Sequence, residues 1–399
     1  MSGRWFCILL GLALWEAFLF PIGAMTSQAA ESGAESAAYA GAETDVSLDL
    51  DQYDLSEIQQ FLNGQAADGW NLSFKDMMKD IMAGRLENVM ERIGGSIRNA
   101  LFSEVKNNGY MMGQIMILGI IGAVFTNFSS IFTGSQISET GFFVTYLLLF
   151  TYLAASFFTS ITIAGKVVGQ ILGFMKALMP AFFLAAAFAG GSVSAAASYE
   201  FTLMAITVAQ AVSAQLLLPM TKVYALLVMA GHVAKEDLLS KLTDLLSSAI
   251  SWILKTMVGI VLGFHLIQGL VLPYVDSMKT GAVQKLIGII PGVGQGANAV
   301  TSMIIGSGVL VKNTMGAAGV VILLVITLIP MMKLMILMVL YQCVAAVLQP
   351  VCDKRIVSCI SDMARGHKLL LSISASAILL FVVTIAVVCA STNILYYTG

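Results

Sequence analysis

The chain has 399 residues, of which 58% are hydrophobic and 11% are charged, and its formal net charge is −2. Soluble domains contain about 45–50% apolar and about 25% charged residues, so this composition indicates a protein of the lipid bilayer. Without an excess of basic residues the chain is poorly suited to neutralise a nucleic-acid backbone, which argues against nucleic-acid binding. We therefore expect an all-α fold, a polytopic bundle of transmembrane helices.

Residues 1–29 are typical of a signal peptide. They have a positively charged start, an apolar run that extends to Phe20, and small residues before a cleavage point after Ala29. The alternative is an uncleaved anchor helix, because Glu16 and Pro21 interrupt the apolar run only slightly. In both cases the residues that follow, up to residue 108, are expected on the extracytoplasmic side of the membrane.

Residues 30–52 form an acidic stretch rich in Ala and Ser, which predicts a disordered linker. Residues 53–108 are expected to be helical. Asp54 can cap a first short helix, and Ser73 can begin a second helix whose methionine-rich apolar face opposes a basic one. This second helix either packs on its neighbours or lies along the membrane surface. Alternatively, its apolar face docks another protein in the extracytoplasmic space.

Residues 109–399 are predicted to form a multi-pass transmembrane domain. A bilayer is crossed by about 20 apolar residues, and the runs found here predict about eight passes. The runs are residues 111–132, 141–164, 171–190, 201–231, 251–272, 284–310, 315–350 and 368–390. Two of these runs are long and contain an internal proline, so each is either one tilted, broken helix or two short passes.

Two pairs of prolines indicate an internal repeat. Pro180 and Pro291 are 111 residues apart, as are Pro219 and Pro330. This offset defines two units, at about 166–272 and 277–383. Repeats with interrupted helices at matching positions are a common architecture of secondary transporters. The alternative is that apolar sequences align easily without common origin.

Basic residues in short loops predict the orientation of the chain. The strongest cluster, around residues 353–368, is placed in the cytoplasm by the positive-inside tendency, and the C-terminus is then outside. The cluster consists of Lys354, Arg355, Arg365 and Lys368. Three crossings in each repeat unit would invert the second copy, whereas four would make the copies parallel. We favour inversion, with residues 235–244 outside, because too little polar chain follows Pro219 and Pro330 for a turn in water.

Three lysines lie inside apolar runs, where a charge costs about 2.5–3.5 kcal/mol at the bilayer centre unless it is paired, snorkels or faces water. Snorkelling is one interpretation, and a polar pathway through the membrane is the other. Lys222 and Lys333 support the pathway because each follows a repeat proline by three residues. The candidate polar-pathway and helix-break positions are Lys176, Pro180, Pro219, Lys222, Pro291, Pro330 and Lys333.

The sequence contains no motif that predicts an enzyme, a cofactor or a metal site. Hydrolase, metalloprotease and phosphate-loop patterns are absent, and the three histidines are scattered along the chain. The cysteines lie in or beside apolar runs or in the signal segment, so a disulfide framework is not indicated. We therefore expect a protein without catalytic activity and without a bound cofactor.

The chain resembles the stage III sporulation protein AE family. The resemblance is carried by the signal segment, the Tyr53–Leu62 motif, and the stretches at 289–294 and 328–333, and it extends over most of the chain beyond the linker. It implies a membrane subunit of the feeding-tube channel between mother cell and forespore, which supports late forespore gene expression under sigma factor G. The implied partners are other stage III A-series membrane proteins and, through them, the forespore stage II protein Q. No functional site residue is carried over.

The expected function is therefore that of a non-enzymatic subunit of this channel complex, in the mother-cell membrane that surrounds the forespore. A secondary transporter for a small solute, built from the two repeats, is the alternative. A third possibility is a purely structural anchor in which the repeat is only ancestral.

Overall fold

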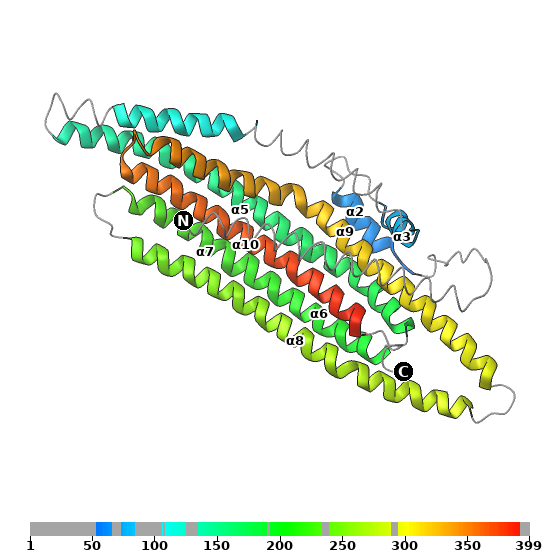
Figure 1. Cartoon of the computed structure of the whole chain (residues 1–399). Coiled ribbons are helices and arrows are strands. Elements are labelled where there is room, and N and C mark those ends of the chain that lie inside the picture. Colours follow the sequence, from blue (N-terminus) through cyan, green and yellow to red (C-terminus); the bar gives the residue numbers. More distant parts are fainter. Residues whose placement is uncertain are drawn as a thin grey trace.

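The computed structural model describes residues 53–65, 73–83, 106, 108–124, 135–189, 192–233, 239–288 and 294–391. Within these ranges the chain is helical apart from caps and turns, which confirms the all-α fold class. Long helices lie side by side in an elongated bundle (Figure 1). They are α5 (Ser135–Phe188), α6 (Ser192–Ala211), the π-helix η3 (Val212–Leu217), α7 (Leu218–Gly231), α8 (Ser240–Gly288), α9 (Gly294–Leu348) and α10 (Lys354–Ser391). The predicted signal peptide (1–29) and linker (30–52) lie outside the described residues.

The described residues contain five helices that are long and apolar enough to cross a membrane, where about eight passes were expected. Two of the expected runs, 141–164 and 171–190, belong to the single helix α5. The run at 315–350 continues the preceding one within α9. In α9 the interrupting residues Lys312, Asn313 and Thr314 are buried by the bundle, whereas in α5 the interrupting Lys166 is exposed and the helix continues past it. The number of passes remains a prediction.

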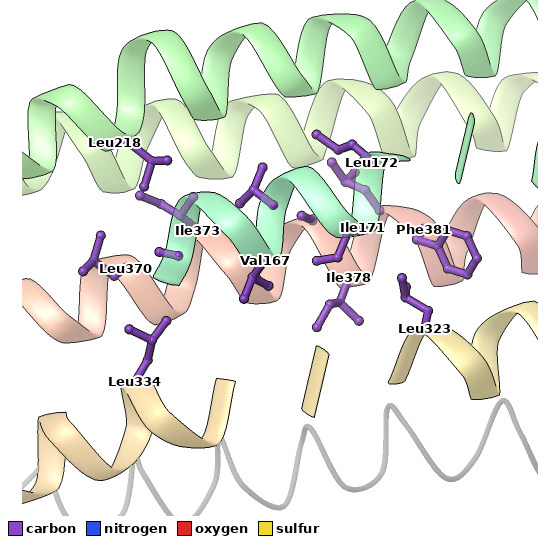
Figure 2. Close-up of a cluster of buried hydrophobic side chains, with 14 of the residues drawn as sticks. Val167, Ile171, Leu172, Leu218, Leu323, Leu334, Leu370, Ile373, Ile378 and Phe381 are labelled. Atoms are coloured by element: carbon purple, nitrogen blue, oxygen red, sulfur yellow. The ribbon is translucent and has the colours of Figure 1, made fainter. Parts of the chain in front are cut away.

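The chain runs back and forth, so that α5, α8 and α10 point one way and α6–α7 and α9 point the other (Figure 1). α10 packs against all of the other long helices and is the centre of the bundle. Buried aliphatic and aromatic side chains fill the space around it (Figure 2). In lipid the hydrophobic effect gives no advantage to helix association, so close packing of such side chains is what holds the helices together. The labelled side chains include Val167 and Ile171 of α5, Leu323 and Leu334 of α9, and Leu370, Ile373 and Phe381 of α10.

Two short helices from the N-terminal region pack on this bundle. In α2 (Ser56–Gln65), the Phe61 ring lies 5.8 Å from the Phe174 ring of α5, centroid to centroid. α3 (Phe74–Met82) packs against α9, and its N-cap Ser73 accepts a hydrogen bond from the Asp76 N–H as the sequence predicts. The Gln59 side chain of α2 accepts a hydrogen bond from the Phe74 N–H at 3.1 Å and so joins the two helices.

The methionine-rich face of α3 is turned toward the protein itself. Phe74 and Met78 are fully buried, and Met77 and Ile81 are nearly so. Of the interpretations that the sequence left open, packing on neighbouring helices is therefore the one found for residues 74–82. The part of the predicted helix beyond residue 83, up to Ile97, lies outside the described residues.

The close contact between α2 and α5 depends on a glycine. A Cβ atom at Gly173 would lie 2.9 Å from Cε2 of Phe61, whereas a Cβ at Gly169, one turn earlier, would meet nothing within 4 Å. We expect Gly173→Leu to displace α2, because overpacking costs about 1–3 kcal/mol. Limited proteolysis of the detergent-solubilised full-length protein would then cut within residues 53–83 several-fold faster than in wild type. Gly169→Leu is the matched control, and equal cleavage rates in both variants would contradict the docking of α2.

The favoured inverted repeat conflicts with the structure. It placed residues 235–244 and 353–368 on opposite sides of the membrane, but Arg365 lies 3.7 Å from Asp244, and an Arg355 Nη donates to the Val233 carbonyl. Both segments are therefore at one end of the bundle. The reason is that the apolar run 284–310 forms no helix of its own: α8 extends to Gly288 and α9 begins at Gly294. An offset of 111 residues then relates two helical hairpins in the same direction, and the repeat itself remains a prediction.

Candidate functional site

The candidate polar-pathway lysines predicted from the sequence lie on several different helices. The Nζ of Lys176 on α5 is exposed and donates to Oε1 of Gln210 on α6 at 3.0 Å. Lys222 on α7 is exposed and lies over the Phe158 ring of α5, 5.0 Å from its centroid. Lys333 on α9 is half-buried. Lys176 and Lys222 are exposed on the bundle, and both snorkelling and a part in a polar pathway remain proposals for them.

The prolines differ in their surroundings. Pro180 lies inside α5 and Pro330 inside α9, both without a break in the assigned helix. Pro219 is at the start of α7, directly after the π-helix η3. Proline cannot donate a backbone hydrogen bond, and a widened π turn lets the chain remain helical around such a residue. Pro291 lies outside the described residues.

A buried lysine was missed by sequence reasoning. Lys312 on α9 is 0% exposed, and its Nζ donates to the backbone carbonyl of Cys389 at 3.0 Å. Cys389 is two residues from the end of α10, where the aligned peptide dipoles leave partial negative charge. The charge of Lys312 is thus placed where the central helix can stabilise it. The sequence hid this because the polar triplet of residues 312–314 looked like a loop between two apolar runs.

The two residues after Lys312 are also buried. Asn313 is 9% exposed and Thr314 is 0% exposed. Within the part of the chain that the structure describes, Asn313 Oδ1 and Thr314 Oγ1 have no hydrogen-bond partner. Buried polar atoms are normally paired, and leaving one unpaired costs about 1–3 kcal/mol. The Lys312–Thr314 segment therefore combines a buried charge with two unpaired buried polar atoms, and charged groups within membranes are usually functional.

A second polar group joins α5, α9 and α10 farther along the bundle. Nε2 of His367 is 2.9 Å from the Ser160 hydroxyl, and its Nδ1 is 2.9 Å from the Met363 carbonyl. Beside it, the Tyr341 hydroxyl donates to Oγ of Ser156 at 2.7 Å. His367, Ser160 and Tyr341 are 0% exposed. A carbonyl faces Nδ1 where a hydrolase triad has a carboxylate, so the pair joins helices and is not arranged for nucleophilic catalysis.

A third polar contact joins α8 to α10. Nε2 of His265 is 3.0 Å from the Thr384 hydroxyl, and both residues are buried. Apart from the Tyr341–Ser156 bond between α9 and α5, these contacts involve α10, whose residues 367, 384 and 389 contribute a side chain or a carbonyl. No group of metal-ligating side chains occurs among the described residues. The interior of the bundle can therefore hold charge and hydrogen bonds along its central helix.

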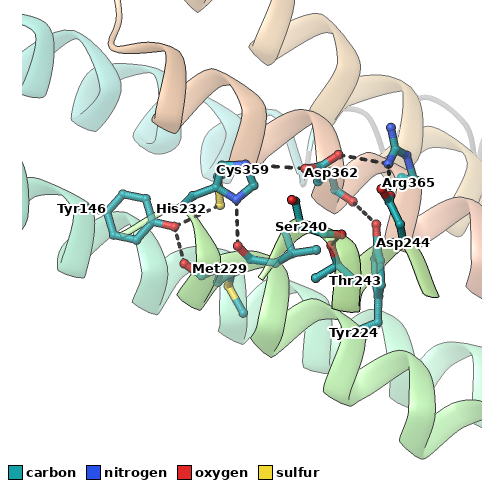
Figure 3. Close-up of polar contacts among 11 residues, drawn as sticks. Tyr146, Tyr224, Met229, His232, Ser240, Thr243, Asp244, Cys359, Asp362 and Arg365 are labelled. Atoms are coloured by element: carbon teal, nitrogen blue, oxygen red, sulfur yellow. Dashed lines mark hydrogen bonds and ion pairs between the residues drawn. The ribbon is translucent and has the colours of Figure 1, made fainter. Parts of the chain in front are cut away.

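Charged residues gather at the end of the bundle where α7 leads into α8 and where α10 begins (Figure 3). Asp362 of α10 is 3.6 Å from Nε2 of His232 and 3.6 Å from a guanidinium nitrogen of Arg365. Arg365 also reaches Asp244 of α8. Such exposed or half-exposed ion pairs contribute about 0–1 kcal/mol each. More important than their energy is their position. They make this end of the bundle polar, and it is the end that carries the basic residues predicted to be cytoplasmic.

Comparison with known proteins decides the family. The family model of stage III sporulation protein AE matches residues 72–392, which include α3 and all of the long helices. The chain belongs to the stage III sporulation protein AE family. The stage III sporulation protein AE of Bacillus subtilis (strain 168) is 24% identical to it over 295 residues, 74% of each chain. No solved structure matches the chain.

Membership in the stage III sporulation protein AE family confirms the resemblance found in the sequence. With its long apolar helices, the chain is a multi-pass membrane protein involved in sporulation. The family is not known as one of enzymes.

Proposed function

We propose that this chain is an integral membrane subunit of the feeding-tube channel between mother cell and forespore, required for late forespore gene expression. The observation that carries the proposal is the family match over residues 72–392. The subunit resides in the mother-cell membrane around the forespore. Its partners are other stage III A-series proteins and, through them, the forespore stage II protein Q.

The position of α2 and α3 supports this role. Tyr53, just before α2, has its ring against that of Phe188, the last residue of α5. The basic residues around Arg365 are at the other end of the bundle, where α10 begins. If the basic end is cytoplasmic, the N-terminal helices face the space between the two membranes. Their outer side there exposes polar residues of α2 to partner proteins, namely Glu57, Gln60 and Asn63.

The test is genetic and biochemical. In an endospore-forming host that lacks its own copy, this gene should restore heat-resistant spores and a late forespore reporter, and affinity purification during sporulation should recover other stage III A-series proteins. A host that sporulates normally without the gene, or a purified protein that recovers none of them, would refute the proposal.

A secondary transporter is the second candidate, and the burial of Lys312 inside an apolar bundle favours it. Transport sites of such proteins lie inside the membrane and use charged side chains that face the bundle interior. This function predicts a growth defect of vegetative cells on a particular solute, and uptake of that solute by proteoliposomes. The channel subunit predicts a defect that is confined to sporulation.

A further inference from the structure

Exposed apolar side chains occur on several helices of the bundle, and two groups of them lie on opposite faces at different positions along its length (Figure 1). Near its start, α5 exposes Val144 and Leu148, which are 55% and 50% exposed. The helix of residues 108–124 approaches α5 near Thr145 and extends this apolar face with Ile117 and Ile121. In its second half, α8 exposes Ile260, Leu266, Ile267 and Leu270, which are 60–70% exposed.

The stretches of α5 and α8 that lack charged residues are displaced along the bundle in the same way as these exposed apolar groups. α5 has no Asp, Glu, Lys or Arg in residues 140–165, α10 has none in 369–391, and α8 has none in 256–275. At about 1.5 Å per residue, each stretch is about 30–39 Å long and can cross a hydrocarbon core of about 30 Å. The three helices therefore each contain one segment of the length that a bilayer needs.

Side-chain contacts fix the positions of these stretches along the bundle. Tyr146, within the α5 stretch, hydrogen-bonds Cys359, which precedes the α10 stretch by ten residues. Phe174, beyond the α5 stretch, contacts Phe381 inside the α10 stretch at 5.8 Å. Thr384, three residues later, bonds His265 in the middle of the α8 stretch. The α5 stretch therefore lies well before the other two along the bundle, and the α10 and α8 stretches lie at nearly the same level.

Each apolar face has a polar face opposite it. Across the bundle from the start of α5, Lys241, Asp244 and Arg365 are exposed, with Leu245 beside them as in a helix at a membrane interface. Across the bundle from the second half of α8 lies α2, since Phe61 contacts Phe174 at the level of Phe381 and Thr384. α2 exposes Glu57, Gln60 and Asn63 there. The two ends of the bundle thus have their polar faces on opposite sides.

We propose that the bundle crosses the bilayer at a steep tilt, with the start of α5 and the second half of α8 both in the hydrocarbon core. The beginnings of α8 and α10 then lie in cytoplasmic water, and α2 lies in water on the other side. The centres of the α5 and α8 stretches are displaced by about 35 Å along the bundle, across three helix layers of about 10 Å each, which gives a tilt of about 45°. This is slightly beyond the usual range of about 0–40° for single transmembrane helices.

Tilt also accounts for the length of the helices. α5 has 54 residues, so it is about 81 Å long, far more than one hydrocarbon core. In an upright bundle, either the apolar start of α5 or the apolar second half of α8 would be in water. In the tilted bundle both are covered by lipid, and the polar corners at Asp244 and on α2 are not.

The proposal is tested by spin labels on the full-length protein in liposomes of phosphatidylethanolamine and phosphatidylglycerol. Single cysteines in a cysteine-free background are placed at Leu148, Ile267, Asp244 and Gln60, and accessibility to oxygen and to a water-soluble nickel complex is compared. We expect lipid environments, with oxygen favoured, at Leu148→Cys and Ile267→Cys. The labels at Asp244→Cys and Gln60→Cys should favour nickel.

The four positions form two matched pairs. Asp244 is near the level of Leu148, and Gln60 is near the level of Ile267, each on the opposite face. In an upright bundle the members of a pair share one environment, so equal accessibility within either pair would overturn the tilt. If the cysteine-free protein does not fold, tryptophan at the same four positions, quenched by brominated lipids, gives the same comparison. These outcomes do not depend on whether the protein is a channel subunit or a transporter.

Discussion

A strain in which methionine replaces Lys312 is expected to lose most of its heat-resistant spores, although the protein itself remains folded. Methionine has nearly the length of lysine and fills the same space, and volume-conserving changes in a core usually cost less than about 1.5 kcal/mol. The change removes the buried positive charge and its bond to the Cys389 carbonyl. Spore counts report the function, and thermal unfolding of the purified protein reports the fold.

Lys176→Met is the matched control. It removes the same charge from α5, but Lys176 is exposed and its removal leaves no buried group unpaired. We expect this strain to sporulate like wild type. Normal sporulation with Lys312→Met would contradict a functional charge inside the bundle. That outcome would mean that Lys312 only stabilises the C-terminal end of α10. It would favour the interpretation of this protein as a purely structural anchor.

The contrast between these lysines shows what the sequence could and could not predict. Charges that interrupt an apolar run are visible in the sequence, and Lys176, Lys222 and Lys333 were found in this way. Lys312 was hidden because its partner on α10 is 77 residues away, and because the neighbouring Asn313 and Thr314 make the segment resemble a loop. Its burial is a consequence of tertiary packing, which no local pattern encodes.

The prediction of helix boundaries from the sequence was limited by tertiary packing in the same way. The N-cap at Ser73 and the apolar face of α3 could be predicted because capping and helical spacing are local. The continuity of α9 was not predicted, because the polar residues 312–314 separate two apolar runs in the sequence. The favoured inversion of the repeat rested on the short polar chain after Pro219 and Pro330 and counted residues 284–310 as a crossing of their own. The histidine contacts at Ser160 and Thr384 also join residues more than 100 positions apart and were not predicted.

Gly308→Leu is expected to destabilise the bundle by at least about 3 kcal/mol, the upper part of the usual cost of overpacking. A Cβ atom at Gly308 would lie 2.7 Å from the carbonyl carbon of Phe188 and 2.8 Å from the nitrogen of Ala189. These are backbone atoms at the end of α5, so they cannot move aside as a flexible side chain can. α9 would have to separate from α5 at this end, and thermal unfolding in detergent should occur at a markedly lower temperature.

Gly306→Leu on the same helix is the control, because a Cβ atom there would meet nothing within 4 Å. Replacing glycine by leucine inside a helix removes backbone freedom from the unfolded chain and gains up to about 1 kcal/mol of helix propensity. The unfolding temperature of Gly306→Leu should therefore equal or exceed that of wild type, so that the two variants change stability in opposite directions. Equal unfolding temperatures would mean that α9 does not pack against the end of α5. Lys312 is only one turn beyond Gly308, so its burial between α9 and α10 would then lose its structural basis as well.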